Sequence, residues 1–107
     1  MRIIPTFSDV SPSFVTRVRL SAAQYTLEFR WNARERAYYL DIRRGGTPVV
    51  NGLRLVRNYD LLRGVRYKAR APQGALYCLD REDDLQTGEV TPSTLGQRYA
   101  IGYQELP

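Results

Sequence analysis

Apolar and polar residues alternate along most of this chain, and a period of two predicts β-strands. The clearest case is residues 24–31, where Tyr25, Leu27, Phe29 and Trp31 fall on one face and polar side chains on the other. Such a strand buries one face in a core and exposes the other to solvent. The strands predicted in this way are residues 15–20, 24–31, 37–43, 49–57, 65–70, 75–80 and 98–105, with a short edge strand at 3–5.

The first two long strands are expected to form a hairpin with a two-residue turn at Ala22 and Ala23. This register keeps the apolar faces together and sets Arg17 opposite Glu28 on the outer face. Opposite charges facing each other across two strands are favourable, so pattern and charge agree on this hairpin.

Two registers keep the apolar face of residues 37–43 against the preceding strand. One sets Glu28 opposite Asp41, and the other, shifted by two residues, sets Glu28 opposite Tyr39. Like charges directly opposed are destabilising on a scale of about 0.2 to 1 kcal/mol, so the second register is the prediction.

The alternation of residues 49–57 slips at Asn51 and Gly52. A bulge there would return Val50, Leu53 and Leu55 to one face, and glycine inside a strand pattern often marks a bulge. A hairpin turn at Asn51 and Gly52 is the alternative.

Two segments are predicted to be irregular. Residues 58–64 are expected to form one helical turn or a tight loop that places Leu61 and Leu62 in the core. Residues 80–97 hold five carboxylate residues together with glycine and proline, a composition typical of a long loop.

The strand count and the length of the chain together predict the fold class. Six to seven short strands within 107 residues favour an all-β protein, a small single-domain antiparallel β-sandwich or flattened β-barrel. Residues 1–107 are expected to be one domain, because a chain of this length builds one core. The 43% of apolar residues is sufficient for that core.

The residue types that usually act in catalysis or bind metal ions are scarce in this chain. The chain has no histidine, one cysteine and one lysine, so Ser-His-Asp and Cys-His arrangements are excluded. A Ser-Lys pair remains formally open, although Lys68 falls in an ordinary strand pattern. The acidic run at residues 80–84 lacks the glycine and the final glutamate of a calcium loop. We therefore expect no enzyme activity, no metal and no cofactor.

The cysteine content and the apolar pattern predict the cellular compartment in which the protein is kept. A lone cysteine cannot form an internal disulfide, and Cys78 is expected to be buried packing in a strand. No apolar run approaches the roughly 18 residues of a membrane span, and no signal segment is evident. The expectation is a soluble protein kept in a reducing compartment, without a membrane partner.

The charge is positive and unevenly distributed. The net charge is +5, and 15 of the 16 basic residues are arginine. Residues 1–70 carry 14 basic and five acidic side chains, whereas residues 71–107 carry two basic and six acidic ones. Arginine binds carboxylate or phosphate with two parallel hydrogen bonds, so the excess suits a protein partner or a nucleic acid. The arginine excess is equally consistent with strand faces that are only exposed to solvent.

Aromatic rings mixed with arginine raise the possibility of a small nucleic-acid-binding β-barrel, on which bases would stack. Tyr25, Phe29, Trp31 and Tyr38 occupy inward positions, however, and only Tyr39 is expected to be exposed. A stacking platform needs exposed rings, so nucleic-acid binding is kept as the alternative function.

Several motifs occur in an order that resembles a known family across nearly the whole chain. They are Ile4-Pro5, Tyr25 to Asn32, Tyr38 to Ile42, Gly52 to Val56, Asp60 to Leu62, Pro72 to Gly74, Leu79-Asp80, Leu95-Gly96 and Tyr103. The sequence is similar to the small baseplate plug proteins of contractile-tailed phages, the family named after a cyanophage plug. Where that family carries acidic residues before Leu-Gly, this chain has Ser93 and Thr94.

The resemblance implies a structural virion protein of the tail baseplate, made in the host cytoplasm and without catalysis. It would plug the lumen of the hub and tube and contact the hub and tape-measure proteins. A three-fold hub would imply about three copies per tail, which could contact one another. The candidate partner-binding residues are Arg17, Arg19, Arg30, Tyr39, Arg43, Arg54, Arg57, Asp83 and Asp84.

Overall fold

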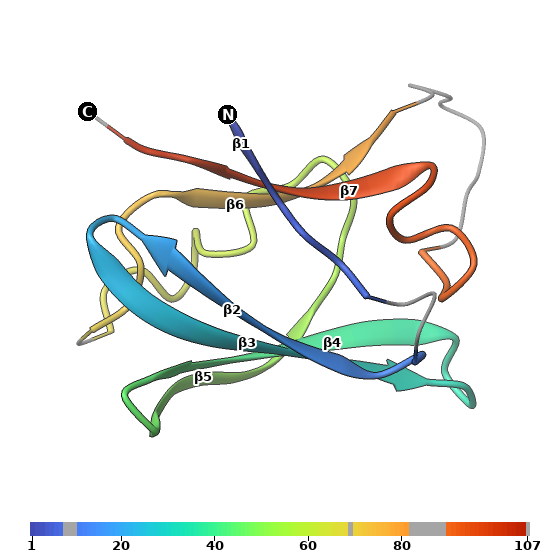
Figure 1. Ribbon diagram of the computed structural model, residues 1–107, viewed down its shortest axis with the longest axis horizontal. Coiled ribbons are helices and arrows are strands. Elements are labelled where there is room, and N and C mark those ends of the chain that lie inside the picture. Colours follow the sequence, from blue (N-terminus) through green and yellow to red (C-terminus); the bar gives the residue numbers. More distant parts are fainter. Residues whose placement is uncertain (8–10, 69, 82–89, 107) are drawn as a thin grey trace.

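The structure is a computed structural model that describes residues 1–7, 11–68, 70–81 and 90–106. These residues form seven β-strands in two antiparallel sheets packed as a sandwich, so the predicted all-β fold class is confirmed (Figure 1). The strands are β1 (Arg2–Ile4), β2 (Phe14–Leu20), β3 (Ala23–Asn32), β4 (Ala37–Arg44), β5 (Thr47–Arg54), β6 (Ala75–Asp80) and β7 (Tyr99–Gln104).

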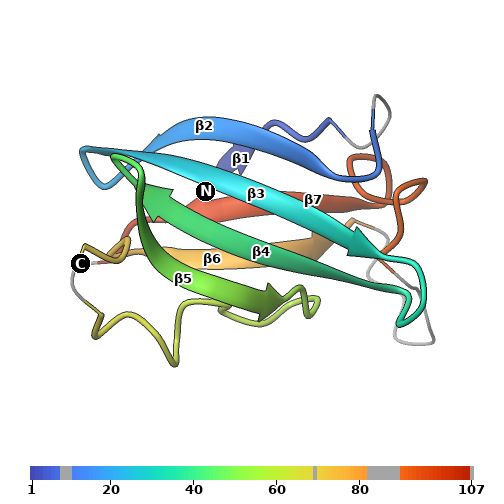
Figure 2. The same ribbon diagram turned by 90° about the horizontal axis from the view of Figure 1, so that it is seen from below.

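The larger sheet has the order β2-β3-β4-β5, in which each strand pairs with the next one along the chain (Figure 2). Burial alternates along β2 and β3 as the sequence pattern predicts. Tight turns connect these strands. Ser21 and Ala22 have φ of 49° and 64°, and Gly45 and Gly46 have φ of 57° and 79°. Two successive positive φ values define the turn whose twist matches a hairpin.

The predicted register of the first hairpin is wrong by two residues. Its turn is Ser21-Ala22 rather than Ala22-Ala23, so Arg17 faces Thr26 and Val15 faces Glu28. The shift of two keeps the same side chains inside, because side-chain direction repeats every second residue.

Two contacts favour the register that forms. It sets Phe14 opposite Phe29, and their rings stack with centroids 4.8 Å apart, a contact worth about 0.5 to 1.5 kcal/mol beyond area burial. It also places Ser21 in the turn, where its hydroxyl lies 2.5 Å from the Tyr103 hydroxyl on β7.

The register predicted between β3 and β4 is also wrong. Glu28 lies opposite Asp41, the arrangement that like-charge repulsion disfavours. Arginines on the same face offset the repulsion, because Arg43 binds Glu28 at 3.2 Å and Arg30 binds Asp41 at 2.9 Å. The predicted register considered only the two residues directly opposite each other, whereas these diagonal neighbours decide the register that forms.

The bulge predicted in the fourth long strand is confirmed. Leu40 pairs with Leu53 and Ile42 with Val50, so β5 contains one residue more than β4 between these two pairs. Gly52 adopts a φ of 76°, a conformation that glycine takes without strain, and its N–H donates to Asp41 Oδ1 at 2.8 Å. β5 nevertheless begins and ends earlier than predicted, at Thr47 and Arg54.

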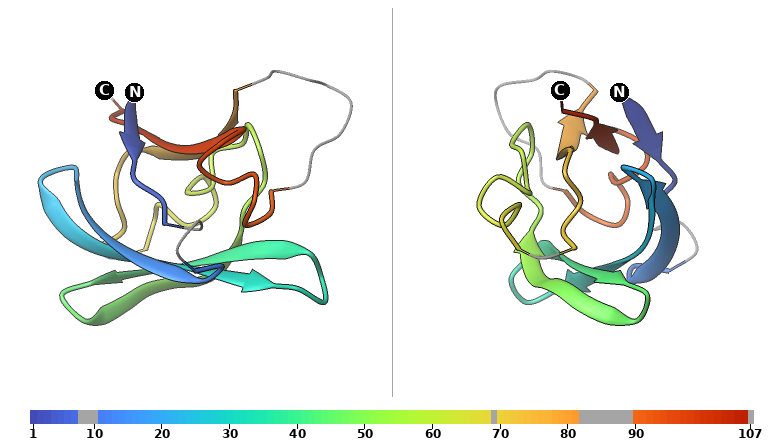
Figure 3. Two further views of the ribbon diagram at one scale, coloured as in Figure 1. Left: turned by 45° about the vertical axis from the view of Figure 1, so that its right-hand side comes forward. Right: turned by 90° about the vertical axis from the view of Figure 1, so that its left-hand side faces the viewer.

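The smaller sheet has the order β1-β7-β6, and the chain after β5 runs beside its β6 edge. Asn58 N–H donates to the Cys78 carbonyl and Leu61 N–H to the Leu76 carbonyl, both at 2.8 Å. This segment therefore closes one side of the sandwich, as the end-on view in Figure 3 shows.

The strand predicted at residues 65–70 is absent among the described residues of that segment, which form turns instead. Val65 and Arg66 both donate their N–H to the Leu62 carbonyl, so local hydrogen bonds replace a strand ladder. The prediction that Leu61 and Leu62 enter the core is confirmed, with exposures of 6% and 0%.

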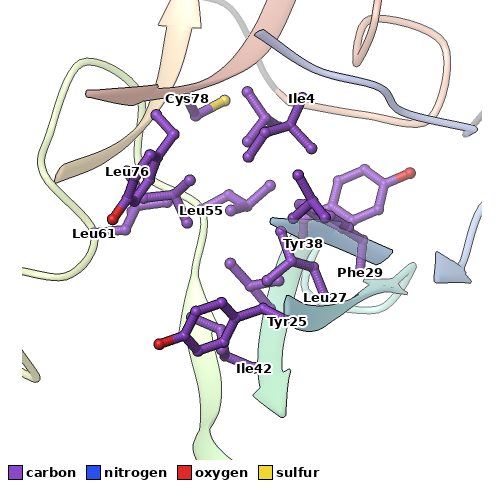
Figure 4. Packing of buried hydrophobic residues seen from close by; sticks show 14 of the residues in the cluster. Ile4, Tyr25, Leu27, Phe29, Tyr38, Ile42, Leu55, Leu61, Leu76 and Cys78 are labelled. Carbon is purple, nitrogen blue, oxygen red and sulfur yellow. The ribbon is translucent and has the colours of Figure 1, made fainter. Parts of the chain in front are cut away.

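The core lies between the two sheets, where side chains from both interdigitate (Figure 4). Tyr25, Phe29 and Tyr38 from the larger sheet face the smaller one and are at most 2% exposed. Cys78 is buried and free, as predicted. Burial, with a smaller contribution from the Asp80 charge, raises the pKa of its thiol to about 12.

Candidate partner-binding surface

The outer face of the larger sheet carries most of the candidate residues, and we call it the basic sheet face. Its arginines are Arg17, Arg19, Arg30, Arg43 and Arg54. They share a face because the strands alternate and the registers keep their outward positions aligned. Arg17, Thr26 and Arg43 form one cross-strand row, and Arg30, Tyr39 and Arg54 form another.

Two carboxylates neutralise part of this face. Arg43 pairs with Glu28, and Arg30 pairs with Asp41 through two hydrogen-bonding atoms. Within the described part of the chain, neither Arg17 nor Arg54 makes an ion pair. Two guanidinium groups therefore remain available to an acidic partner.

The contacts of Asp41 lower its pKa. Partial burial alone would raise the pKa of Asp41. Hydrogen bonds from Arg30 and from the Gly52 N–H, with the charges of Arg30 and Arg43, outweigh burial and hold the pKa below its usual value. Asp41 is thus a fixed anion that orients Arg30 on the basic sheet face.

Tyr39 lies between Arg30 and Arg54 in its row and is half-buried. Its hydroxyl donates to Glu35 in the β3–β4 turn, and this hydrogen bond, with partial burial, raises the pKa of Tyr39. The side chain is therefore held by its own strand–turn unit, with its ring flanked by arginines.

The structure places Arg57 off the basic sheet face. Arg57 lies after β5 and pairs with Asp80 on β6 at 3.3 Å. Arg98 binds the same carboxylate through two nitrogens at 3.0 Å, and the Asp80 side chain is 1% exposed. We call these three residues the Asp80 cluster. Asp83 and Asp84 lie outside the described residues.

A cavity at the end of the larger sheet was not expected from the sequence. It has a volume of about 630 Å³ and lies between the β3–β4 turn and the segment that leaves β5. We call it the end cavity. Its polar lining includes Arg34, Arg36, Arg54 and Arg57, and its apolar wall includes Leu55, Val56 and Val90. The Arg-Glu-Arg run at 34–36 was the available signal, but turn residues alone do not reveal a cavity.

The positions of the aromatic rings decide against a stacking platform on the basic sheet face. Tyr25, Phe29 and Tyr38 are buried, and Trp31 is partly buried against them. Tyr59 and Tyr67 are the exposed tyrosines of the described chain, and both lie in the loop between β5 and β6. That loop lies off the basic sheet face, so these exposed rings do not alternate with the arginines of that face.

Among the described residues there is neither a group of metal-ligating side chains nor a membrane-spanning helix. They contain no group of three or more histidine, cysteine or acidic residues that could hold a metal ion. No helix in this part of the structure has the length and apolarity needed to cross a membrane.

The fold and its surface define a small, arginine-faced β-sandwich whose features suit binding to other macromolecules. The sequence matches the family described as cyanophage baseplate Pam3 plug gp18 over residues 1–105. The chain belongs to this family of phage baseplate plugs. A search of curated proteins found no match.

Membership gives the protein a structural role in a phage baseplate and associates it with other baseplate components. It also locates the chain in the tail baseplate of the virion.

Proposed function

We propose that this protein plugs the lumen formed by the baseplate hub and tail tube of a contractile phage, and that it contacts the hub and tape-measure proteins. The basic sheet face would meet acidic surfaces of these partners. The observation that carries the proposal is the pair Arg17 and Arg54, which are exposed on this face with no ion pair among the described residues. Complementary charge gives specificity with modest net affinity, which suits a plug that must also be displaced.

The remaining parts of the proposal concern the whole chain. Residues 1–107 act as one plug-like β domain, made in the host cytoplasm and assembled without catalysis. About three copies would match the rotational symmetry of a three-fold hub. The other expected contact residues, Asp83 and Asp84, would serve a basic partner segment or a neighbouring copy.

The test is copurification of the tagged chain with the hub and tape-measure proteins of the same phage. Wild type should form a complex that weakens as salt rises, because its contacts are charged. The double variant Arg17→Glu and Arg19→Glu should lose at least about tenfold in affinity, since each substitution replaces attraction by repulsion.

Arg63→Glu with Lys68→Glu is the matched control, because both residues are exposed in the β5–β6 loop and the change in net charge is the same. Absence of any complex at low salt would overturn the proposal. Equal loss in the control and the test variant would show that net charge, not the basic sheet face, determines binding.

A further inference from the structure

The end cavity combines features that a flat basic surface lacks. It is concave, with a volume of about 630 Å³, which falls in the range of ligand sites. Its cations come from two separate segments, the β3–β4 turn and the end of β5. Among the described residues of the lining, Glu35 is the one acidic residue, and its carboxylate accepts the Tyr39 hydroxyl hydrogen bond. Arginines therefore outnumber carboxylates in the described part of the lining.

Two of the lining arginines are open to a ligand. Arg34 and Arg54 are exposed, and neither makes an ion pair or a side-chain hydrogen bond within the described residues. Arg57, by contrast, already binds Asp80. Because Arg34 and Arg54 come from different segments, they can bind a ligand from two sides.

The wall of the cavity is aliphatic. Val56 is 48% exposed, Val90 is partly buried, and Leu55 is 7% exposed. The Leu55 N–H donates to the Tyr38 carbonyl at 3.0 Å, which fixes this segment against β4. An exposed valine beside a rigid apolar wall offers a place for one aliphatic side chain of a ligand.

We propose that the end cavity binds an acidic peptide segment of a baseplate partner, with carboxylates on Arg34 and Arg54 and one aliphatic side chain against Val56. This inference rests on the proposed function for the identity of the partner. The fork of a guanidinium matches a carboxylate with two parallel hydrogen bonds.

A nucleic acid fits the cavity less well. Among the described residues that line it, the one aromatic ring is that of Tyr38, which is 1% exposed and cannot stack on a base. Phosphate tracking also needs cations spaced along a groove, whereas these cations surround one hollow with an apolar wall. The aliphatic wall would be unused by a phosphate backbone.

The experiment measures binding of a fluorescent peptide, alternating aspartate and glutamate around one central leucine, to the purified full chain by anisotropy. Wild type should bind it, and a peptide with serine in place of the leucine should bind several-fold more weakly. Arg34→Ala with Arg54→Ala should weaken binding about tenfold or more. Val56→Asp should do the same without removing a guanidinium, because it adds a carboxylate to the wall.

The matched control is Arg63→Ala with Lys68→Ala, which removes the same charge from the β5–β6 loop and should change affinity less than about twofold. Circular dichroism of each variant checks that the fold is retained. Three results would overturn the inference: no binding of the leucine peptide, an equal loss in the control, or tighter binding of a single-stranded oligonucleotide that the cavity variants abolish.

The peptide assay and the copurification can fail independently, so they test the end cavity and the plug proposal separately. Loss of peptide binding with an intact hub complex removes the end cavity as a site and leaves the plug proposal standing. Peptide binding without any hub or tape-measure complex keeps the acidic-peptide site and removes the proposed partners.

Discussion

Arginine binds carboxylate both in the Asp80 cluster and in the outward Glu28 and Asp41 pairs, and the two groups lie in different surroundings. Asp80 follows Leu76 and Cys78 on the inner side of β6, and its carboxylate is 1% exposed. Glu28 lies on the opposite, outer side of the larger sheet, where its side chain is 29% exposed. Arginine–carboxylate pairing thus occurs both inside the sandwich and on its surface.

The buried group holds segments together, whereas the exposed pairs mainly orient side chains. In the Asp80 cluster, Arg57 lies three residues after β5 and Arg98 directly before β7, so one buried carboxylate joins segments that follow the larger sheet and flank the smaller one. A buried charge depends on its partners, because water cannot replace them. On the basic sheet face, water screens each pair, so these pairs orient arginines more than they stabilise the fold.

The largest expected effect is that of Asp80→Asn. The substitution removes the anion and leaves Arg57 and Arg98, 30% and 17% exposed, partly desolvated without it. We expect a loss of about 2 to 4 kcal/mol in the free energy of unfolding, somewhat below that of a fully buried pair. Urea denaturation measures it.

Glu28→Gln is the control for that measurement, because it neutralises a carboxylate that also binds arginine. Its cost should stay below about 1 kcal/mol, as for exposed pairs. Equal losses in the two variants would contradict the distinction between the cluster and the face.

An intermediate effect is expected for Asp41→Asn, because Asp41 is 14% exposed and its partner Arg30 is 49% exposed. The lowered pKa of Asp41 means that its anion stabilises the folded state above the unfolded pKa of about 3.9. That contribution disappears as pH falls through the folded pKa. We expect a cost of about 0.5 to 1.5 kcal/mol at pH 7 that shrinks below about pH 4.

Urea denaturation of wild type and Asp41→Asn at several pH values between about 3 and 7 measures this difference. If the difference in the free energy of unfolding between the two proteins stayed constant from about pH 3 to about pH 7, Asp41 would stabilise the fold through its shape rather than its charge.

The sequence alone predicted the inward rings and the bulge at Gly52, because period-two alternation depends only on backbone geometry. It failed where a choice depended on side chains distant along the chain. The β3–β4 register depended on Arg43 and Arg30, which offset the repulsion between Glu28 and Asp41.

Part of the candidate site could likewise be predicted from the sequence, and part could not. Outward positions on the strands, such as Arg17 and Arg54, follow from alternation and could be predicted. The role of Arg57 could not, since its partner Asp80 lies 23 residues further along the chain. The end cavity needed the turn at residues 34–36 to lie beside the end of β5, and only the folded chain brings these segments together.

The smallest expected effect on stability is that of Arg17→Ala. Arg17 is exposed, and no ion pair or side-chain hydrogen bond holds it within the described residues. Its removal should change the free energy of unfolding by less than about 0.5 kcal/mol, the usual range for surface substitutions. The same variant should still weaken the complex with the hub, so its two measurements separate binding from folding. A loss above about 1 kcal/mol in urea would mean that Arg17 belongs with the Asp80 cluster as a structural residue.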